Sequence, residues 1–175
     1  TEGCHKPMGK YIFNNVNFSI NDPMLPKLRE AGYHVVVNPT DEHNAIVTFP
    51  VAWENIRFDK EGDLYVNNET AIEQLSRYKL LMDSYVEQNC SITISYKEDE
   101  VPAIRDWLKS NWSSYVGVSF LPITNTTYEY LPQEVVTEAR YKEYVAQLTE
   151  VDFSDTDSTH EIEGDECATG VCPTK

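Results

Sequence analysis

Basic side chains are scarce in this 175-residue sequence: 14 Lys and Arg residues stand against 29 Asp and Glu residues, which gives a formal net charge of −15. Nucleic acid is therefore not expected as a partner, because contacts with phosphate groups require a basic surface. Long apolar runs are also absent, and no stretch approaches the roughly 18 residues that cross a bilayer. We expect no membrane insertion and no signal peptide, since a basic start followed by an apolar segment is missing too.

The sequence also lacks the short motifs that mark common catalytic sites. It has no Gly-rich phosphate loop, no His-Glu-x-x-His and no Gly-x-Ser-x-Gly. Its four histidines are scattered, so these patterns predict no metal site and name no cofactor-binding residue. With seven Gly and 41% hydrophobic residues, the composition is that of one globular domain or part of one.

Cysteine is another scarce residue type. Four are present, and Cys167 and Cys172 stand in the final stretch DECATGVCPTK. Their Cys-x4-Cys spacing is wider than the two-residue gap of most zinc knuckles, and two thiolates do not complete a tetrahedral site. A disulfide between them would close a small loop and stabilise little. We interpret the pair as exchangeable thiols, with idle tail thiols as the alternative.

The other two cysteines, Cys4 and Cys90, carry weaker signals. Cys90 stands between an expected helix and an expected strand, and we interpret it as a small buried apolar side chain. Because four cysteines are few for a disulfide scaffold, a reducing compartment is favoured and a cytoplasmic location is expected. A secreted, disulfide-bonded glycoprotein is an alternative, since Asn-x-Ser/Thr sequons occur at Asn68, Asn89, Asn111 and Asn125.

Apolar patterning predicts strands that alternate with helices. Residues 10–20, 34–39, 45–51, 91–96 and 115–122 are strand-like, residues 22–32, 69–89, 99–112 and 133–148 are helix-like, and Gly62 centres a hairpin. This order predicts an α/β fold with βαβ units and a largely parallel sheet. The expected apolar face of the helix at 69–89 consists of Ile72, Leu75, Leu81, Met82 and Tyr85.

The end of the sequence differs from the rest in composition. From residue 150 to residue 175 there are eight acidic residues and one basic residue, so this segment carries −7 of the net charge. Such an acidic run is typical of a solvated, self-repelling linker. We therefore divide the chain into a folded part, residues 1–150, and a flexible acidic tail, residues 151–175.

Four stretches together resemble one family: GKYIFNNVNFSINDPMLPKLREAGY, IVTFPV, EQLSRYKLLMDSYVEQNCSITISYKEDEVPAIRDWLKSNW and YVGVSFLP. They are similar to the C-terminal part of the adenosylcobalamin-dependent (class II) ribonucleotide reductases, in the monomeric branch that acts on ribonucleoside triphosphates. The ending CATGVCPTK is similar to the family's ending of two cysteines, then Pro and a basic residue. The resemblance runs from about residue 3 to residue 175.

The resemblance implies a ten-stranded α/β barrel, of which this chain would hold the C-terminal strands and helices. It implies an enzyme that converts ribonucleoside triphosphates to deoxyribonucleotides by radical chemistry, with adenosylcobalamin bound mostly outside this segment. Cys167 and Cys172 would be the redox relay pair that reduces the active-site disulfide and is itself reduced by thioredoxin. The expected partners are therefore thioredoxin, the triphosphate substrate and the missing N-terminal part of the reductase.

The chain departs from the family pattern where the radical chemistry starts. The family's radical cysteine has Asn two residues before it and Glu two residues after it, and neither Cys4 nor Cys90 has these neighbours. We therefore expect a fragment that lacks the radical cysteine. A non-catalytic module that binds a separately encoded half of the reductase is a further alternative.

Overall fold

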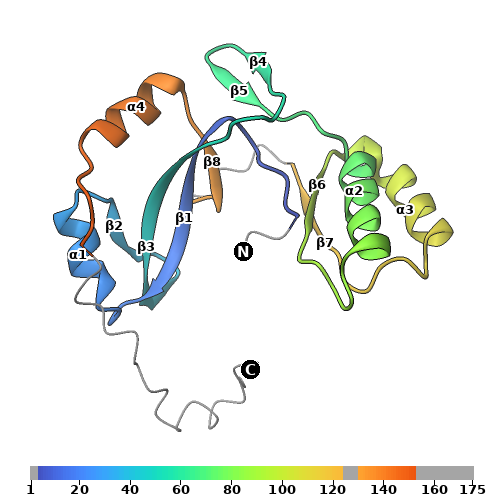
Figure 1. Cartoon of the computed structure of the whole chain (residues 1–175), viewed down its shortest axis with the longest axis horizontal. Coiled ribbons are helices and arrows are strands. Elements are labelled where there is room, and N and C mark those ends of the chain that lie inside the picture. The colour runs from blue at the N-terminus through green and yellow to red at the C-terminus, as the bar shows by residue number, and fades with distance from the viewer. Residues whose placement is uncertain (1–3, 124–129, 153–175) are drawn as a thin grey trace, which may run out of the picture.

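The computed structural model of the chain describes residues 4–123 and 130–152, which form two groups of elements standing side by side (Figure 1). One group holds a four-stranded sheet with two helices, and the other holds a pair of strands with two helices. In chain order the elements are β1 (Tyr11–Ser19), α1 (Met24–Glu30), β2 (Val35–Asn38), β3 (Asp41–Ala52), β4 (Asp59–Glu61), β5 (Leu64–Val66), α2 (Ala71–Ser84), β6 (Thr93–Tyr96), the 3-10 helix η1 (Glu98–Glu100), α3 (Val101–Ser110), β7 (Ser119–Pro122), β8 (Gln133–Val135) and α4 (Glu138–Ala146).

The larger sheet has the order β2-β3-β1-β8, and every neighbouring pair in it is antiparallel. The prediction of a largely parallel sheet is therefore wrong for this group. β1, α1 and β2 do form a βαβ unit, because β1 and β2 both run opposite to β3. A two-residue turn folds β3 directly back onto β2. Because β3 then lies between β1 and β2 in the sheet, the βαβ unit is of the split kind.

The first core lies between α1 and this sheet. Leu25 and Leu28 of α1 pack against Ala45 and Val47 of β3, and all four are buried. The helix predicted over residues 22–32 is present as α1, but it starts later: its N-cap is Pro23, which makes no side-chain cap bond, and Asp22 Oδ1 accepts a hydrogen bond from Met24 N–H at 2.8 Å just before it. The predicted stop is confirmed: Gly32 has φ +89°, a conformation that favours glycine.

The second core lies between α2, α3 and the strands β6 and β7, which form the one parallel pair among the described strands. Here the predicted βαβ unit is confirmed as β6, α3 and β7. The hairpin of β4 and β5 around Gly62 is confirmed too, with Gly62 at φ +61°. Figure 1 shows that hairpin between the two groups, with α2 and α3 on the outer side of β6 and β7.

Two predictions about helices need correction. Helix α2 buries Ala71, Gln74, Leu75 and Tyr78, and Tyr85, which we expected on the apolar face, is 86% exposed. The segment predicted as one helix, 133–148, is divided between β8 and α4. Its first residues pair with β1, where Val135 faces Ile12, so tertiary pairing overrides a helical pattern.

The described residues confirm a mixed α/β fold, and the ten-stranded barrel stays a prediction. Within residues 4–123 and 130–152, no helix is long and apolar enough to span a bilayer. The boundary at residue 150 is also a prediction, although Val151 packs against the first core.

Candidate functional site

The two predicted relay cysteines, Cys167 and Cys172, lie outside the described residues, together with most of the acidic tail. Only the origin of the tail is described. Val151 packs against the core of α1 and β3, and Lys27 Nζ donates a hydrogen bond to Asp152 O at 3.2 Å. The tail therefore begins beside α1.

The edge of β6 that faces away from β7 is closed by hydrogen bonds from two other segments of the chain. A segment that we call the N-terminal strap, residues 4–10, meets this edge at Cys4 and His5 and then bonds the segment before α2, β5 and β8. Cys4 N–H donates to Ser91 O at 3.1 Å, and Thr93 N–H donates to His5 Nδ1 at 3.1 Å. Since Nδ1 accepts, the proton of neutral His5 sits on Nε2, which contacts Ser91 Oγ at 3.2 Å.

Gln74 of α2 completes the same edge with its side-chain amide. Its Oε1 accepts from Ser95 N–H at 3.1 Å, and its Nε2 donates to Ser95 O at 2.8 Å. These are the two backbone bonds that a neighbouring strand would make. The Gln74 side chain is fully buried, so it satisfies two backbone groups that water cannot reach.

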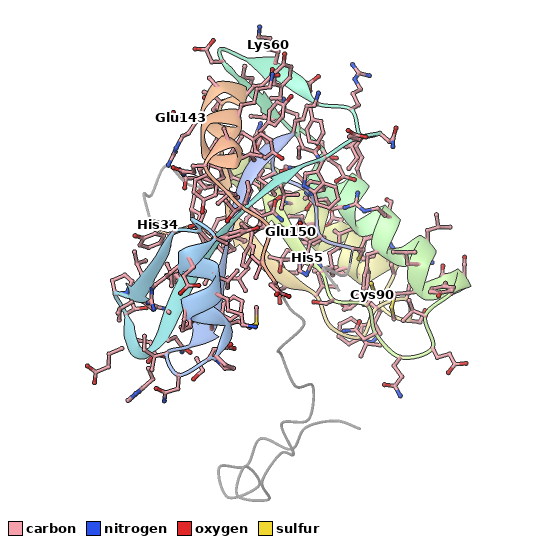
Figure 2. The ribbon with its side chains drawn as sticks, turned by 60° about the vertical axis from the view of Figure 1, so that its left-hand side comes forward. His5, His34, Lys60, Cys90, Glu143 and Glu150 are labelled. Atoms are coloured by element: carbon pink, nitrogen blue, oxygen red, sulfur yellow. The ribbon has the colours of Figure 1, made fainter. Side chains whose placement is uncertain are left out.

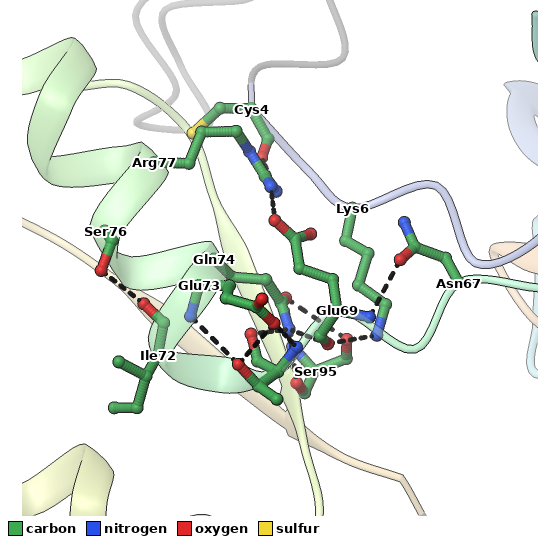
Figure 3. A network of polar contacts seen from close by, with 11 residues as sticks. Cys4, Lys6, Asn67, Glu69, Ile72, Glu73, Gln74, Ser76, Arg77 and Ser95 are labelled. Carbon is green, nitrogen blue, oxygen red and sulfur yellow. Dashed lines mark hydrogen bonds and ion pairs between the residues drawn. The ribbon is translucent and has the colours of Figure 1, made fainter. Parts of the chain in front are cut away.

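A buried lysine and an ion pair hold the strap against the start of α2 (Figure 3). Lys6 is 5% exposed, and its Nζ donates to Glu69 O at 2.9 Å. Burial lowers the pKa of Lys6. The Glu69 carboxylate pairs with Arg77, whose Nη2 also donates to Cys4 O at 3.3 Å. The strap is therefore fixed at its backbone and at its side chains.

Two thiols meet at the same place. Cys4 Sγ donates to Ser91 O at 3.7 Å, and Cys90 Sγ donates to the same oxygen at 3.9 Å. Burial first, and then the hydrogen bond with the Cys90 thiol, raises the pKa of Cys4 to about 11. Cys4 is therefore protonated at neutral pH.

The interpretation of Cys90 as a buried side chain is thereby corrected. Cys4 is the buried partner, at 8% exposed, while Cys90 packs against the second core and stays partly exposed. Figure 2 labels Cys90 and His5, the strap residue that follows Cys4. The sequence signal for the pair was weak, because 86 positions separate the two cysteines.

The start of α2 is satisfied by groups of the chain itself. Thr70 and Glu73 form a capping box: Thr70 Oγ1 accepts from Glu73 N–H at 3.3 Å, and Glu73 Oε2 accepts from Thr70 N–H at 2.7 Å. Glu100 Oε1 accepts from Ala71 N–H at 2.7 Å. We therefore assign this helix start a structural role.

A cleft of about 840 Å³ lies between α4 and the larger sheet. Tyr144 spans it: its hydroxyl donates to Thr48 O at 2.9 Å and accepts from His34 N–H at 2.8 Å. Burial raises the pKa of Tyr144. Figure 2 labels His34 and Glu143, which line this cleft. Its central polar groups already bond one another, so they hold α4 to the sheet.

A second cleft, of about 490 Å³, lies between α3 and β7 and is mostly apolar. Trp112 beside it is 76% exposed, and the whole of β7 is exposed, including Phe120 and Leu121. In the described residues this surface has no covering element.

As for metals, residues 4–123 and 130–152 contain no group of three or more His, Cys, Asp or Glu side chains placed to hold an ion.

A solved enzyme structure contains a similar mixed α/β arrangement. The crystal structure of a B12-dependent (class II) ribonucleotide reductase matches 86% of this chain with a TM-score of 0.62 and 23% identity, and the match covers 21% of that chain. The fold of the described part is therefore that of a segment of a class II ribonucleotide reductase. No protein-family model matches the chain.

The relatives in sequence agree with the fold. A probable adenosylcobalamin-dependent ribonucleoside-triphosphate reductase of Dictyostelium discoideum is 31% identical over 157 residues, which are 87% of this chain and 20% of the relative. The adenosylcobalamin-dependent ribonucleoside-triphosphate reductase of Lactobacillus gasseri is 24% identical over 182 aligned residues, which cover 100% of this chain and 24% of the relative. The chain is thus a homologue of a segment of these reductases, and it spans about a fifth to a quarter of their length.

Proposed function

We propose that this chain is part of an adenosylcobalamin-dependent ribonucleoside-triphosphate reductase, and that Cys167 and Cys172 are its exchangeable dithiol, re-reduced by thioredoxin. The observation that carries the proposal is the extent of the similarity. The match to the Lactobacillus gasseri reductase covers the whole of this chain and so includes the acidic tail with both cysteines.

The exposed apolar surface of α3 and β7 supports a chain that functions as part of a larger fold. Trp112 and Phe120 line the cleft there and both are exposed, and β7 pairs on one edge only among the described strands. Apolar side chains on an open strand edge are a liability that folded proteins cover. The missing part of the reductase is the occupant that we propose for this surface.

The cofactor of the relatives would be held by the rest of the enzyme. The two clefts of the described residues measure about 840 and 490 Å³, the range that encloses drug-sized molecules, and adenosylcobalamin is much larger. The larger cleft is also crossed by the hydrogen bonds of Tyr144. Neither of these two clefts therefore fits this cofactor by itself, and we assign no described residue a role in cobalamin chemistry.

The proposed tail chemistry is thiol–disulfide exchange. The dithiol of Cys167 and Cys172 passes two electrons and two protons to the active-site disulfide, and the tail is left as a disulfide. Thioredoxin then returns two electrons and two protons by the same exchange. With Val151 and Asp152 held at α1, the 14 residues 153–166, as a random coil, would span roughly 19–22 Å, and repulsion between their acidic side chains favours a longer reach.

The relay can be tested on the purified 175-residue chain. The chain, oxidised with a small disulfide and freed of it, is mixed with thioredoxin, thioredoxin reductase and NADPH. We expect rapid consumption of about one NADPH per chain, since each disulfide accepts two electrons. The double variant Cys167→Ser, Cys172→Ser should lose this rapid phase.

The chain provides a matched control in its other two cysteines. The double variant Cys4→Ser, Cys90→Ser removes the same number of thiols and should keep the rapid phase, because the tail is intact. Equal rapid consumption by both double variants would show that the tail pair is no preferred substrate of thioredoxin and would refute the relay.

A second test uses the complete reductase that contains this segment. Replacing Cys167 or Cys172 with Ser should leave a single turnover intact, because the active-site thiols start reduced. Repeated turnover with thioredoxin should collapse, and a small dithiol that reaches the active site should restore much of the rate. Normal repeated turnover of the double variant with thioredoxin would contradict the proposal.

A further inference from the structure

The thiol pair at the strap is a feature that the proposed function does not use. Cys4 and Cys90 come from segments far apart in the sequence, and their sulfur atoms lie 3.7 and 3.9 Å from the same carbonyl oxygen of Ser91. The strap is held in place there by the Cys4–Ser91 backbone bond and by His5. The two thiols are therefore presented to each other by a fixed framework.

We propose that Cys4 and Cys90 form a reversible disulfide, with a low-molecular-weight disulfide such as oxidised glutathione as the oxidant. The bond would link the N-terminal strap to the segment between α2 and β6. It is independent of the proposed function, because it uses neither cysteine of the tail.

The reaction takes two exchange steps. The Cys90 thiolate attacks one sulfur of oxidised glutathione, forms a mixed disulfide and releases one glutathione thiolate. Cys4 then attacks the sulfur of Cys90 and displaces the second glutathione. The two protein thiols lose two electrons and two protons, and two molecules of reduced glutathione are formed, so the step is balanced.

Burial assigns the order of the two cysteines. Cys90 is partly exposed, so a dissolved disulfide can reach it, whereas Cys4 is 8% exposed. The pKa of Cys4, about 11, also keeps it protonated in the free state, and a thiol reacts through its thiolate. Cys90 is therefore the attacking residue and Cys4 the resolving residue.

The disulfide would clamp the two groups of elements together. The strap contacts the second group through Ser91, and it contacts the first group where Gln133 Oε1, beside β1, accepts from Met8 N–H at 2.9 Å. A covalent bond at Cys4 closes a loop that contains most of the first group and the whole of α2. Loops of such length restrict the unfolded chain strongly.

The test uses the variant Cys167→Ser, Cys172→Ser, in which Cys4 and Cys90 are the two remaining sulfhydryl groups. It is equilibrated at low protein concentration with mixtures of reduced and oxidised glutathione, quenched with acid, alkylated and analysed by mass spectrometry. We expect both thiols to disappear together in a monomer that is lighter by two hydrogens, with the peptide of Cys4 joined to that of Cys90. The melting temperature should rise by roughly 5–15 °C, and dithiothreitol should reverse the change.

Single variants in this background separate the steps. With Cys4→Ser, oxidation should stop at a glutathione adduct on Cys90. With Cys90→Ser, the buried Cys4 should stay a free thiol, and the melting temperature should not shift on oxidation. If one single variant fails to fold, the other still provides the comparison.

Three results in the parent variant would overturn the proposal. They are free thiols on both residues in excess oxidised glutathione, a glutathione adduct that persists on Cys90 beside a free Cys4, and disulfides formed only between molecules. None of them affects the thioredoxin assay of the tail, so the two proposals fail separately.

Discussion

Replacing Gln74 with Leu should destabilise the protein more than the similar volumes of the two side chains suggest. The amide of Gln74 satisfies both the N–H and the C=O of Ser95 at 3.1 and 2.8 Å, and the side chain is fully buried. Each buried backbone group left without a partner costs about 1–3 kcal/mol. The greater hydrophobicity of Leu offsets part of this loss, so we expect a net decrease of about 2–4 kcal/mol in the free energy of unfolding.

Urea denaturation followed by far-UV circular dichroism measures the change, with the slope against urea concentration unchanged. Ser76→Ala is the control on the same helix, because Ser76 is exposed and its hydroxyl bonds only Ile72 O at 2.7 Å; it should change stability by less than about 0.5 kcal/mol. If Gln74→Leu is also within about 0.5 kcal/mol of the wild type, the reading of Gln74 as a substitute for a strand is wrong.

A second variant, Gln74→Glu, adds a dependence on pH. The protonated carboxyl keeps one donor and one acceptor for Ser95, whereas the ionised form cannot donate. Burial would raise the pKa of the introduced carboxyl above its unfolded value. The stability of the Gln74→Glu variant relative to wild type is therefore highest below the pKa of this carboxyl in the unfolded chain. It falls as the pH rises from that value to the higher pKa of the folded state. Relative to wild type, the loss should be clearly smaller near pH 4 than at pH 7.

The other predictions concern the turns, the α4 contact and the thiol pair. Gly32→Ala should lower the free energy of unfolding by at least about 2 kcal/mol, because φ is +89° and a Cβ would meet a backbone oxygen at 2.8 Å. Gly62→Ala, where φ is +61° and the space is open, should lower it by about 1 kcal/mol. Equal losses in urea denaturation would contradict the steric argument. Tyr144→Phe should lose about 1–2 kcal/mol, since its hydroxyl makes two bonds, and the exposed Tyr85, changed to Phe, should lose almost nothing in the same assay. The rate at which Cys4 closes the mixed disulfide can be measured by stopped-flow alkylation. It should rise roughly tenfold per pH unit from about pH 7 to pH 9, because the pKa of Cys4 is about 11. A flat profile would show that thiolate formation does not limit closure.

Much of the fold follows from local signals in the sequence. Alternating residues define β1, Gly32 follows the end of α1, and Gly62 marks the hairpin of β4 and β5. The sheet order could not be derived in this way, because it depends on β3 pairing with both β1 and β2. The strand β8 was hidden for a related reason: its sequence suits a helix, and only its pairing with Ile12 and its neighbours makes it a strand.

The candidate site was less accessible to sequence analysis. Gln74 shares the buried face of α2 with Ala71, Leu75 and Tyr78. A polar residue on an otherwise apolar helix face indicates a buried group that makes hydrogen bonds. The neighbourhood of Cys4 and Cys90 carries no comparable signal. It depends on Cys4 and His5 meeting the chain at Ser91 and Thr93, and a single sequence does not reveal contacts at that separation.

The covering of β6 has a consequence for synthesis of the chain. The groups that close its outer edge, in the strap and in α2, all precede β6 in the sequence. On the ribosome they emerge first, so β6 meets a prepared partner as soon as it appears. Without Cys4 and His5, the edge would emerge uncovered at Ser91 and Thr93, where another chain could add a strand.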